Sequence, residues 1–450
     1  MKPVSVKRLL ASALGASLLL QAGSASALGL LQAYEAALQN DPTYRSAIHE
    51  NEAGQQYAAL GRASLLPSVS LNYSASHNRA DVTQPNIQGK QVTSHPQYQS
   101  NNGSLSLRQP LFNPDGVARY RQGVAQTNYS EATFSGRRQD LVLRLTGAYV
   151  DAQYAQDQLA LAEAQRDAYA EQMRVNQRMF QKGEGTRTDM LETQAKLDVA
   201  EAQVIESRDN LSTARNTLAA MVGQEVTYLD PLASGFRVKP MQPTDFDAWK
   251  TLALEKNPEL SAQRFAVEAA RQEVEKSRAA HAPRIDFIAS YSQGKSETIN
   301  TYNQDTTGRS IGLQMSLPLY SGGYASAAST QAVANRDKAQ SDLDTKTGQV
   351  LVELRKQYSL VLSSMARIDA LVKSVNSSEV LVEATRQSIK GGVRINLDLL
   401  NAQQQLYAAR RDLAQARYNY LLSNLRLRNA AGTLGEEDLR DTARYFVAAR

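Results

Sequence analysis

The strongest constraint on this sequence is that it repeats itself once along its length. Three pairs of landmarks recur in the same order: 38–42 (LQNDP) with 254–258 (LEKNP), 109–112 (QPLF) with 317–320 (LPLY), and 182–183 (KG) with 391–392 (GG). The offset falls from 216 to about 208 residues along the chain, so the loop near 80–100 is longer than its counterpart near 299–305. The fold must therefore be built from two copies of one unit, which we place at 28–222 and 249–431.

Each copy contains two segments in which apolar and small polar residues alternate, as in half-buried strands. We expect strands at about 66–76 and 103–112 in the first copy, and at about 284–292 and 309–320 in the second. One apolar and one small polar face suits a barrel wall between lipid and water. Soluble hairpins packed on a core are the alternative. Phe112 and Tyr320 end the return strands, as residues of an interfacial aromatic girdle would.

Two segments without proline, 116–181 and 323–390, predict unusually long helices. At 1.5 Å per residue each would be roughly 100 Å long. Tight turns at 182–188 and 391–397 lead into shorter helices at 189–222 and 398–431. These carry apolar residues every seven positions, namely Met190, Leu197, Val204, Leu211 and Leu218, and then Leu399, Leu406, Leu413, Tyr420 and Leu427. Most have a small residue three positions later, so we expect closely packed, coiled helices.

The N-terminus predicts export from the cytoplasm. Lys2, Lys7 and Arg8 precede a short apolar run, and small residues at 25–27 fit a signal peptidase site. We expect a signal peptide at 1–27 and a mature chain that begins near Leu28. The run is too short to span a bilayer, and no later apolar run approaches the length of a membrane helix. A chain of this kind would cross a membrane only as a closed β-barrel.

Composition excludes several functions. With no cysteine, the chain has no disulfide, no thiolate metal site and no lipid anchor at a cleavage-site cysteine. Three of the charges behind the net charge of +5 lie in the signal peptide, which leaves about +2 and does not suggest binding to nucleic acid. Phosphate loops, dinucleotide fingerprints and nucleophile elbows are missing from the sequence, so we expect neither an enzyme nor a cofactor. His77 and His95 could form a surface metal site, but solvated histidines are commoner.

Four strands cannot close a membrane barrel, which needs at least eight. The chain must therefore oligomerise or leave its strand edges exposed. A dimer would supply eight strands, a trimer twelve and a tetramer sixteen. Eight-stranded barrels are filled by side chains, so a conducting pore favours three or more copies.

The sequence resembles the TolC family of outer-membrane efflux and secretion proteins over almost all of its mature length. The resemblance is strongest in 392–402 (GVRINLDLLNA), 416–420 (ARYNY) and 431–434 (AGTL). It implies a mainly α fold with a membrane β-barrel: a homotrimer with a twelve-stranded barrel, four strands per chain, continued by a long periplasmic α-helical barrel. It also implies an equatorial domain built from about 223–248 and the C-terminal segment 432–450.

The same resemblance implies a gate at the periplasmic tip turns. Gly183 and Gly185 would shape the first turn, and Gly391 and Gly392 the second. By position, Asp398 would be an acid of the constriction ring, Arg394 a bridging cation, and Asp189 its partner from the first repeat. Asn401 stands where the family has a second ring acid, and Ile389 where it has a tyrosine. Both acids could also simply cap their helices.

We expect an outer-membrane channel that works with a periplasmic membrane-fusion adaptor and an inner-membrane ABC exporter or other pump. The absence of a lipid anchor and the segment 392–434 favour type I protein secretion, for example of an extracellular protease or lipase. Efflux of small molecules is the alternative, and a soluble periplasmic coiled-coil adaptor is a remote one. The resemblance implies a location in the outer membrane, extending into the periplasm, after export by a cleaved signal peptide.

Overall fold

The computed structural model describes residues 27–233, 235–296 and 304–447. It divides into two compact units. Unit 1 contains residues up to 49, 134–258 and those from 347 onward, and unit 2 contains 50–133 and 259–346. The expected signal peptide lies outside the described residues except for Ala27. Within the described residues, no helix combines the length and the apolar character that a membrane span requires.

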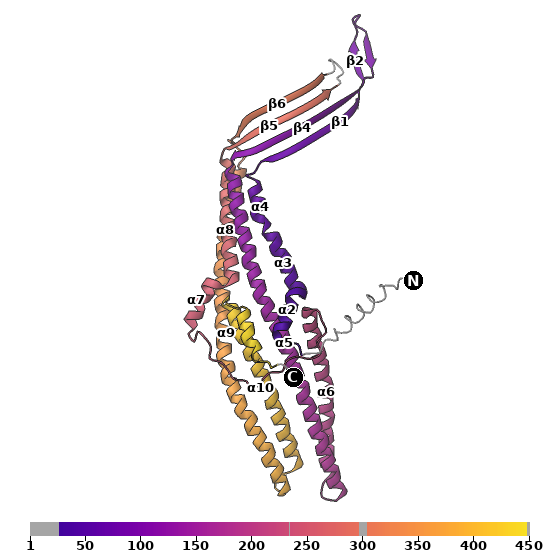
Figure 1. Ribbon diagram of the computed structural model, residues 1–450, viewed down its shortest axis with the longest axis vertical. Coiled ribbons are helices and arrows are strands. Elements are labelled where there is room, and N and C mark those ends of the chain that lie inside the picture. The colour runs from indigo at the N-terminus through magenta and orange to yellow at the C-terminus, as the bar shows by residue number, and fades with distance from the viewer. Residues whose placement is uncertain (1–26, 234, 297–303, 448–450) are drawn as a thin grey trace, which may run out of the picture. The chain divides into compact units, whose positions relative to one another are not determined.

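Unit 2 contains a four-stranded antiparallel sheet in the order β1-β4-β5-β6 (Figure 1). The strands are β1 (Ser68–Arg79), β4 (Gln97–Phe112), β5 (Arg284–Ser296) and β6 (Gln304–Ser316). Each repeat contributes one hairpin, and the two hairpins meet where β4 pairs with β5 over almost their whole length. The sheet therefore joins the repeats through its central pair and leaves β1 and β6 as its edges.

The register gives the sheet two different faces. Ser70, Ser106, Ser290 and Ser310 follow one another across the four strands, and the hydroxyls of Ser70 and Ser106 lie 2.7 Å apart, as do those of Ser290 and Ser310. The neighbouring row, on the opposite face, is Val69, Leu107, Ala289 and Ile311. Val69 is 66% exposed and Ile311 79% exposed. The apolar face of the sheet is thus exposed in the single chain.

Two features of the sheet differ from the expectation. The return strand β6 ends at Ser316 rather than near 320, because its partner β5 begins at Arg284, directly after Pro283, and Pro318 has no amide to donate. Tyr320 therefore lies beyond the strand, whereas Phe112 is the last residue of β4. In addition, β1 and β4 extend into the segment expected to be a loop. The short hairpin of β2 (Val82–Pro85) and β3 (Gln91–Ser94) occupies much of the remainder.

A buried carboxylate ties β4 to β5 near the ends that adjoin the helices. Asp286 is 2% exposed, and its Oδ2 accepts a hydrogen bond from Arg108 Nε at 2.9 Å. Arg284 Nε donates to Oδ1 of the same residue at 3.0 Å. A carboxylate removed from water needs such paired donors to remain charged. This interaction lies beside the bulge between Pro110 and Phe112 and holds the two repeats together there.

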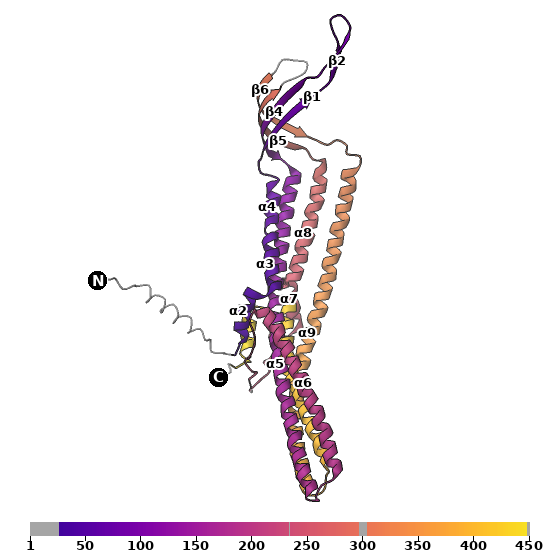
Figure 2. The ribbon, with the colours of Figure 1, turned by 90° about the vertical axis from the view of Figure 1, so that its right-hand side faces the viewer.

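Helices account for most of the described chain (Figures 1 and 2). They are α2 (Leu30–Asn40), α3 (Pro42–Gly54), α4 (Gln56–Ala63), α5 (Pro114–Gln181), α6 (Arg187–Val222), α7 (Phe246–Lys256), α8 (Pro258–Arg278), η1 (Ala279–His281), α9 (Tyr324–Lys390), α10 (Asn396–Ala430) and α11 (Glu436–Ala443). The long helices α5 and α9 have 68 and 67 residues. Each turns sharply at its C-terminus into the shorter helix that follows.

The heptad positions form the packed seam of α10. Leu399, Leu406, Leu413, Tyr420 and Leu427 are all buried, and so are the small residues Ala402, Ala409, Ala416 and Ser423. In α6 the last three heptad positions, Val204, Leu211 and Leu218, are likewise buried. Tyr418 adds a polar contact between α10 and α5, because its hydroxyl donates to Asp157 Oδ2 at 2.6 Å. Burial of this site raises the pKa of the Asp157 carboxyl.

The equatorial segment expected at 223–248 pairs with both ends of the described chain. Leu28 forms a parallel bridge with Leu229, and Leu232 an antiparallel bridge with Phe446. Ala233 N donates to Tyr445 O at 2.8 Å. The C-terminal segment that takes part includes α11, so residues that are distant in sequence form one layer of unit 1.

The C-terminus of α10 turns where the backbone of another element leaves no room for a side chain. Gly432 has a φ of 71°, and a Cβ at this residue would lie 2.4 Å from Lys256 O and from Asn257 Cα. The Asn257 side chain donates to Ala430 O at 2.9 Å and so caps the helix end. A glycine is required here both by the left-handed backbone and by this close approach.

We expect Gly432→Ala to destabilise the protein by about 2 kcal/mol or more, because it adds a steric clash to backbone strain. Gly348→Ala is the matched control: Gly348 lies inside α9 and a Cβ there would meet nothing within 4 Å. That variant should gain up to about 1 kcal/mol from helix propensity. Thermal unfolding measures both changes, and a Tm of the Gly432 variant equal to that of the parent would contradict this account.

Candidate functional site at the tip turns

The two tip turns have the same backbone structure and lie at the same end of unit 1 (Figures 1 and 2). In the first, Gly183 N donates to Phe180 O at 3.0 Å and Glu184 N to Met179 O at 2.9 Å. In the second, Gly392 N donates to Ile389 O and Val393 N to Ser388 O, both at 3.0 Å. This bond pattern closes a helix around one left-handed residue. The two repeats therefore have equivalent backbone hydrogen bonds at their tip turns.

The four predicted tip glycines are not equivalent. Gly183 and Gly392 have φ values of 77° and 72° and form the left-handed corner of each turn. A Cβ at Gly185 would lie 3.1 Å from Met179 Cβ, which is tight. A Cβ at Gly391 would have only ordinary contacts, the nearest at 3.6 Å. Gly183 and Gly392 are thus the positions at which the turn itself requires glycine.

Asp189 caps the helix that it opens. Thr186 N donates to Asp189 Oδ2 at 3.1 Å, the Thr186 hydroxyl donates to the same oxygen at 2.6 Å, and Asp189 N donates back to Thr186 Oγ1 at 3.1 Å. This reciprocal arrangement is a capping box, which satisfies donors at the N-terminus of α6. The carboxylate is therefore held within its own turn.

Asp398 occupies the same position in the second repeat but has no such partner. The residue that corresponds to Thr186 is Ile395, which has no side-chain oxygen, and it precedes α10 without a side-chain cap. Asp398 is half-buried, whereas Arg394 and Asn401 are exposed. Among the ion pairs of the described residues, none joins Arg394 to Asp189 or to Asp398. Within one chain these groups lie near the tip without forming the predicted bridge.

A buried polar network lies directly behind the tip turns. Asn176 of α5, Thr193 of α6 and Asn396 of α10 are 5%, 0% and 9% exposed. Asn176 Nδ2 donates to Thr193 Oγ1 at 2.8 Å, and Asn396 Nδ2 donates to the same oxygen at 3.1 Å. Gln172 Nε2 donates to Asn396 Oδ1 at 3.0 Å and to Asn176 Oδ1 at 2.9 Å. Four side chains therefore connect the first repeat to the start of α10.

This network was not predicted from the sequence. Its only sequence signal is that polar residues stand at buried helical positions, and such residues need partners. The second repeat lacks an equivalent: Thr385 stands in the place of Asn176, and its buried hydroxyl has no hydrogen-bond partner. Behind the network, Tyr169, Ala200 and Leu400 form a small buried apolar cluster. The first repeat thus holds α10 with polar bonds at the tip and with apolar packing beyond it.

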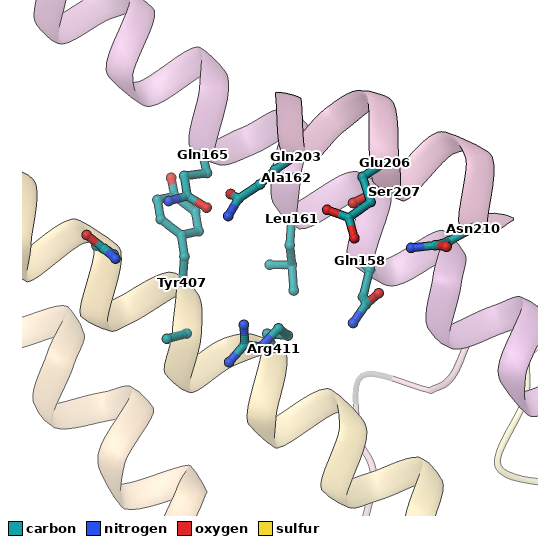
Figure 3. A pocket seen from close by; sticks show the side chains of 12 residues that line it. Gln158, Leu161, Ala162, Gln165, Gln203, Glu206, Ser207, Asn210, Tyr407 and Arg411 are labelled. Carbon is teal, nitrogen blue, oxygen red and sulfur yellow. The ribbon is translucent and has the colours of Figure 1, made fainter. Parts of the chain in front are cut away.

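A polar groove of about 290 Å³ lies farther along the same helices (Figure 3). Its walls come from α5, α6 and α10. They include Gln158, Gln165, Gln203, Glu206, Asn210, Tyr407 and Arg411. Figure 3 shows Glu206 and Arg411 on opposite sides of the groove. A carboxylate, a guanidinium and several amides along a helical groove can form many hydrogen bonds with a polar helical surface.

The remaining predicted positions lie in unit 2. Phe112 is 48% exposed and Tyr320 is 87% exposed, one at the end of a strand and the other beyond it. The Nδ1 atom of His95 contacts the Asp81 carboxylate. No group of three or more metal-ligating side chains occurs among the residues that the structure describes.

Comparison with known proteins identifies close relatives. The chain is 46% identical to the alkaline protease secretion protein AprF of Pseudomonas aeruginosa, over 99% of this chain and 93% of that protein. It is 42% identical to the proteases secretion protein PrtF of Dickeya chrysanthemi, over 96% of this chain and 94% of that protein. Its identity to the outer membrane protein TolC of Escherichia coli is 28%, over 96% of this chain and 88% of that protein.

A structural match and a family match are consistent with these relatives. The crystal structure of the outer membrane protein VceC from Vibrio cholerae superposes with a TM-score of 0.75 at 20% identity, covering 90% of this chain and 96% of that chain. The chain therefore has the fold of this outer membrane protein, with two repeats and mostly helical structure. The family described as outer membrane efflux protein matches residues 21–224 and 249–433. The resemblance to TolC is thereby confirmed, and the chain belongs to the outer membrane efflux protein family.

Proposed function

We propose that the chain is the outer-membrane channel of a type I protein secretion system that exports a protease or a similar extracellular protein. The observation that carries this proposal is the 46% identity, over nearly the whole chain, with a relative named for alkaline protease secretion. A second relative named for protease secretion is 42% identical. The identity to the TolC relative is lower. Two relatives are named for secretion and the family is named for efflux. We therefore propose transport, and not catalysis, as the function.

The channel would be a homotrimer in the outer membrane. The edges β1 and β6 are unpaired in one chain, so β1 of one copy can pair with β6 of the next and close a twelve-stranded barrel. The exposed apolar face would then contact lipid. The helices would continue as a tunnel in the periplasm. Exposed Leu191, Val199 and Ile205 of α6 support contact between copies there.

Two partners would complete the secretion system. An inner-membrane ABC exporter would supply energy and cargo, and a periplasmic membrane-fusion adaptor would connect it to the channel. The groove in Figure 3 supports the adaptor proposal, because its amides, Glu206 and Arg411 suit a polar helical hairpin. A signal peptide cleaved near Leu28 would deliver the chain to the periplasm.

The tip turns would form the gate of this tunnel. Three copies of Asp398 would ring the axis, and the absence of a capping partner leaves its carboxylate available for this role. Arg394 is exposed and could bridge to Asp189 of a neighbouring copy. Asn401, in place of a second ring acid, would make the ring less negative. The buried network at Asn396 would keep the start of α10 against the first repeat.

Replacing Asp398 with Ala or Asn should lower cation selectivity and weaken block by divalent and trivalent cations several-fold, because a ring of carboxylates attracts cations. Single-channel recordings in planar bilayers measure both properties. Asp369→Asn is the control, since this exposed acid lies on α9 and pairs with Lys373. Unchanged selectivity and block in the Asp398 variants would remove this residue from the gate.

Asn396→Ala should raise the single-channel conductance. The variant removes the hydrogen bonds that Asn396 makes with Gln172 and Thr193, so α10 would be held less firmly at the tip. Gln340→Ala is the control, because it removes an exposed hydrogen bond to Asp344 within α9. A lower Tm together with unchanged conductance would show that the network serves stability alone.

Deletion of the gene tests the function itself. Quantitative comparison of culture supernatants should show that one or a few secreted proteins are lost while their cellular pools remain. Re-expression of the chain should restore them. An unchanged supernatant, combined with greater sensitivity to toxic small molecules, would instead favour the efflux alternative.

A further inference from the structure

The first residue of the expected mature chain is hydrogen-bonded through both its backbone amide and its backbone carbonyl. Leu28 N donates to Tyr228 O at 2.8 Å. The Leu28 carbonyl accepts a hydrogen bond from the Tyr149 hydroxyl at 3.0 Å. The parallel bridge to Leu229 places the segment at 228–230 alongside it. A chain end is usually loosely held unless specific contacts of this kind fix it.

Tyr149 is buried at this site and contacts several of its parts. Its side chain is 0% exposed, and its ring packs edge-on against Phe446 with the ring centres 5.2 Å apart. Its oxygen also accepts a hydrogen bond from Asp230 N at 3.1 Å. One phenol therefore links the expected N-terminus to the equatorial segment. Burial, together with the nearby Asp230, raises the pKa of Tyr149, so this hydroxyl stays protonated and donates.

A carboxylate lies beside the same stretch of chain. A Cβ built on Gly29 would be 3.0 Å from Asp230 Oδ2, so this oxygen reaches the residue next to Leu28. Gln32 Oε1 accepts a hydrogen bond from Gly29 N at 3.3 Å. Two side-chain oxygens therefore face the backbone just before α2 begins at Leu30. They add to the carbonyl oxygen of Tyr228, which already binds Leu28 N.

We propose that this site binds the chain's own α-ammonium group, which cleavage after Ala27 creates at Leu28. The Tyr228 carbonyl and the Asp230 carboxylate are its acceptors. The proposal rests on the export proposed above. Within a longer chain the nitrogen of Leu28 is an amide with one hydrogen and no charge. After cleavage the same nitrogen has three donors and a positive charge, so it can keep its bond to Tyr228 and also face Asp230.

The consequence is that processing strengthens the equatorial layer. Hydrogen bonds from a charged donor are about twice as strong as those between neutral groups. An amide in place of the ammonium keeps one bond but loses the attraction to Asp230. The contact of the N-terminus with 228–230 is therefore weaker in the precursor than in the mature protein. Any residue added before Leu28 has the same effect, because it moves the charge away from the site.

Chemical labelling of the terminal amine tests the site directly in the processed protein purified in detergent. N-terminal sequencing must first show Leu28. An acylating reagent used near neutral pH favours the α-amine over lysine, because its ordinary pKa is lower by more than two units. We expect acylation of Leu28 to be about tenfold slower in the native protein than in urea. Asp230→Asn should raise the native rate. An equal rate in both states would overturn the proposal.

A pair of insertions tests the effect on stability. Ser-Gly inserted between Ala27 and Leu28 leaves the cleavage site but extends the mature chain, and it should lower the Tm by a few degrees. The same dipeptide inserted between Gln88 and Gly89, in the exposed β2–β3 turn, is the control and should change nothing. Asp230→Asn should lower the Tm of the parent more than that of the extended chain, because the two changes remove one shared contact.

Equal effects of Asp230→Asn in the parent and in the extended chain would overturn the proposal, and so would an N-terminus other than Leu28. Neither outcome bears on the channel. Secretion is measured separately by the supernatant comparison, so failure of one proposal is distinguishable from failure of the other.

Discussion

The antiparallel pairing of β4 with β5 is the interaction on which the rest of this structure depends. It is the one ladder of the described sheet that joins the two repeats, and the buried Asp286 with its two arginines reinforces it. Because the central pair is formed between repeats, each hairpin leaves one strand at an edge of the sheet. A single chain of this topology cannot close its own sheet. The proposed pairing between copies therefore rests on the order of these four strands, with β1 and β6 as the edges, and not on any helix.

At the opposite end of each long helix, the two repeats are alike in backbone and different in side chains. Both turns close around a left-handed glycine with the same two hydrogen bonds. Thr186 then allows Asp189 to cap its helix, whereas Ile395 offers Asp398 nothing. The difference between Thr186 and Ile395 thus gives the two acids different surroundings. Asp189 caps its own helix, whereas Asp398 has no capping partner. The two repeats therefore share the backbone of the tip turn and differ in the side chains that it carries.

Much of the fold could be predicted from the sequence, because periodicity and turn residues act locally. The heptad of α10, the alternation in the strands and the corner glycines Gly183 and Gly392 all follow from short-range patterns. The strand end at Ser316 was missed, since it depends on where the partner strand begins. The network of Asn176, Thr193 and Asn396 was missed for a stronger reason. Its members, which include Gln172, are up to 224 residues apart, and a polar residue in a helix does not reveal whether it faces water or another amide.

The row of serines across the sheet gives one of its faces a particular surface chemistry. Each side chain is short and uncharged, and each hydroxyl is already hydrogen-bonded to that of a neighbouring serine. Exchanging such a bond for one with a passing peptide group yields little net free energy. The charged residues on the same face, Arg108, Arg284 and Asp286, pair with one another at the end near the helices, so the serine row itself presents no charge. If the proposed barrel closes with this face inward, an unfolded polypeptide that crosses the row would meet the same weak contact at each serine.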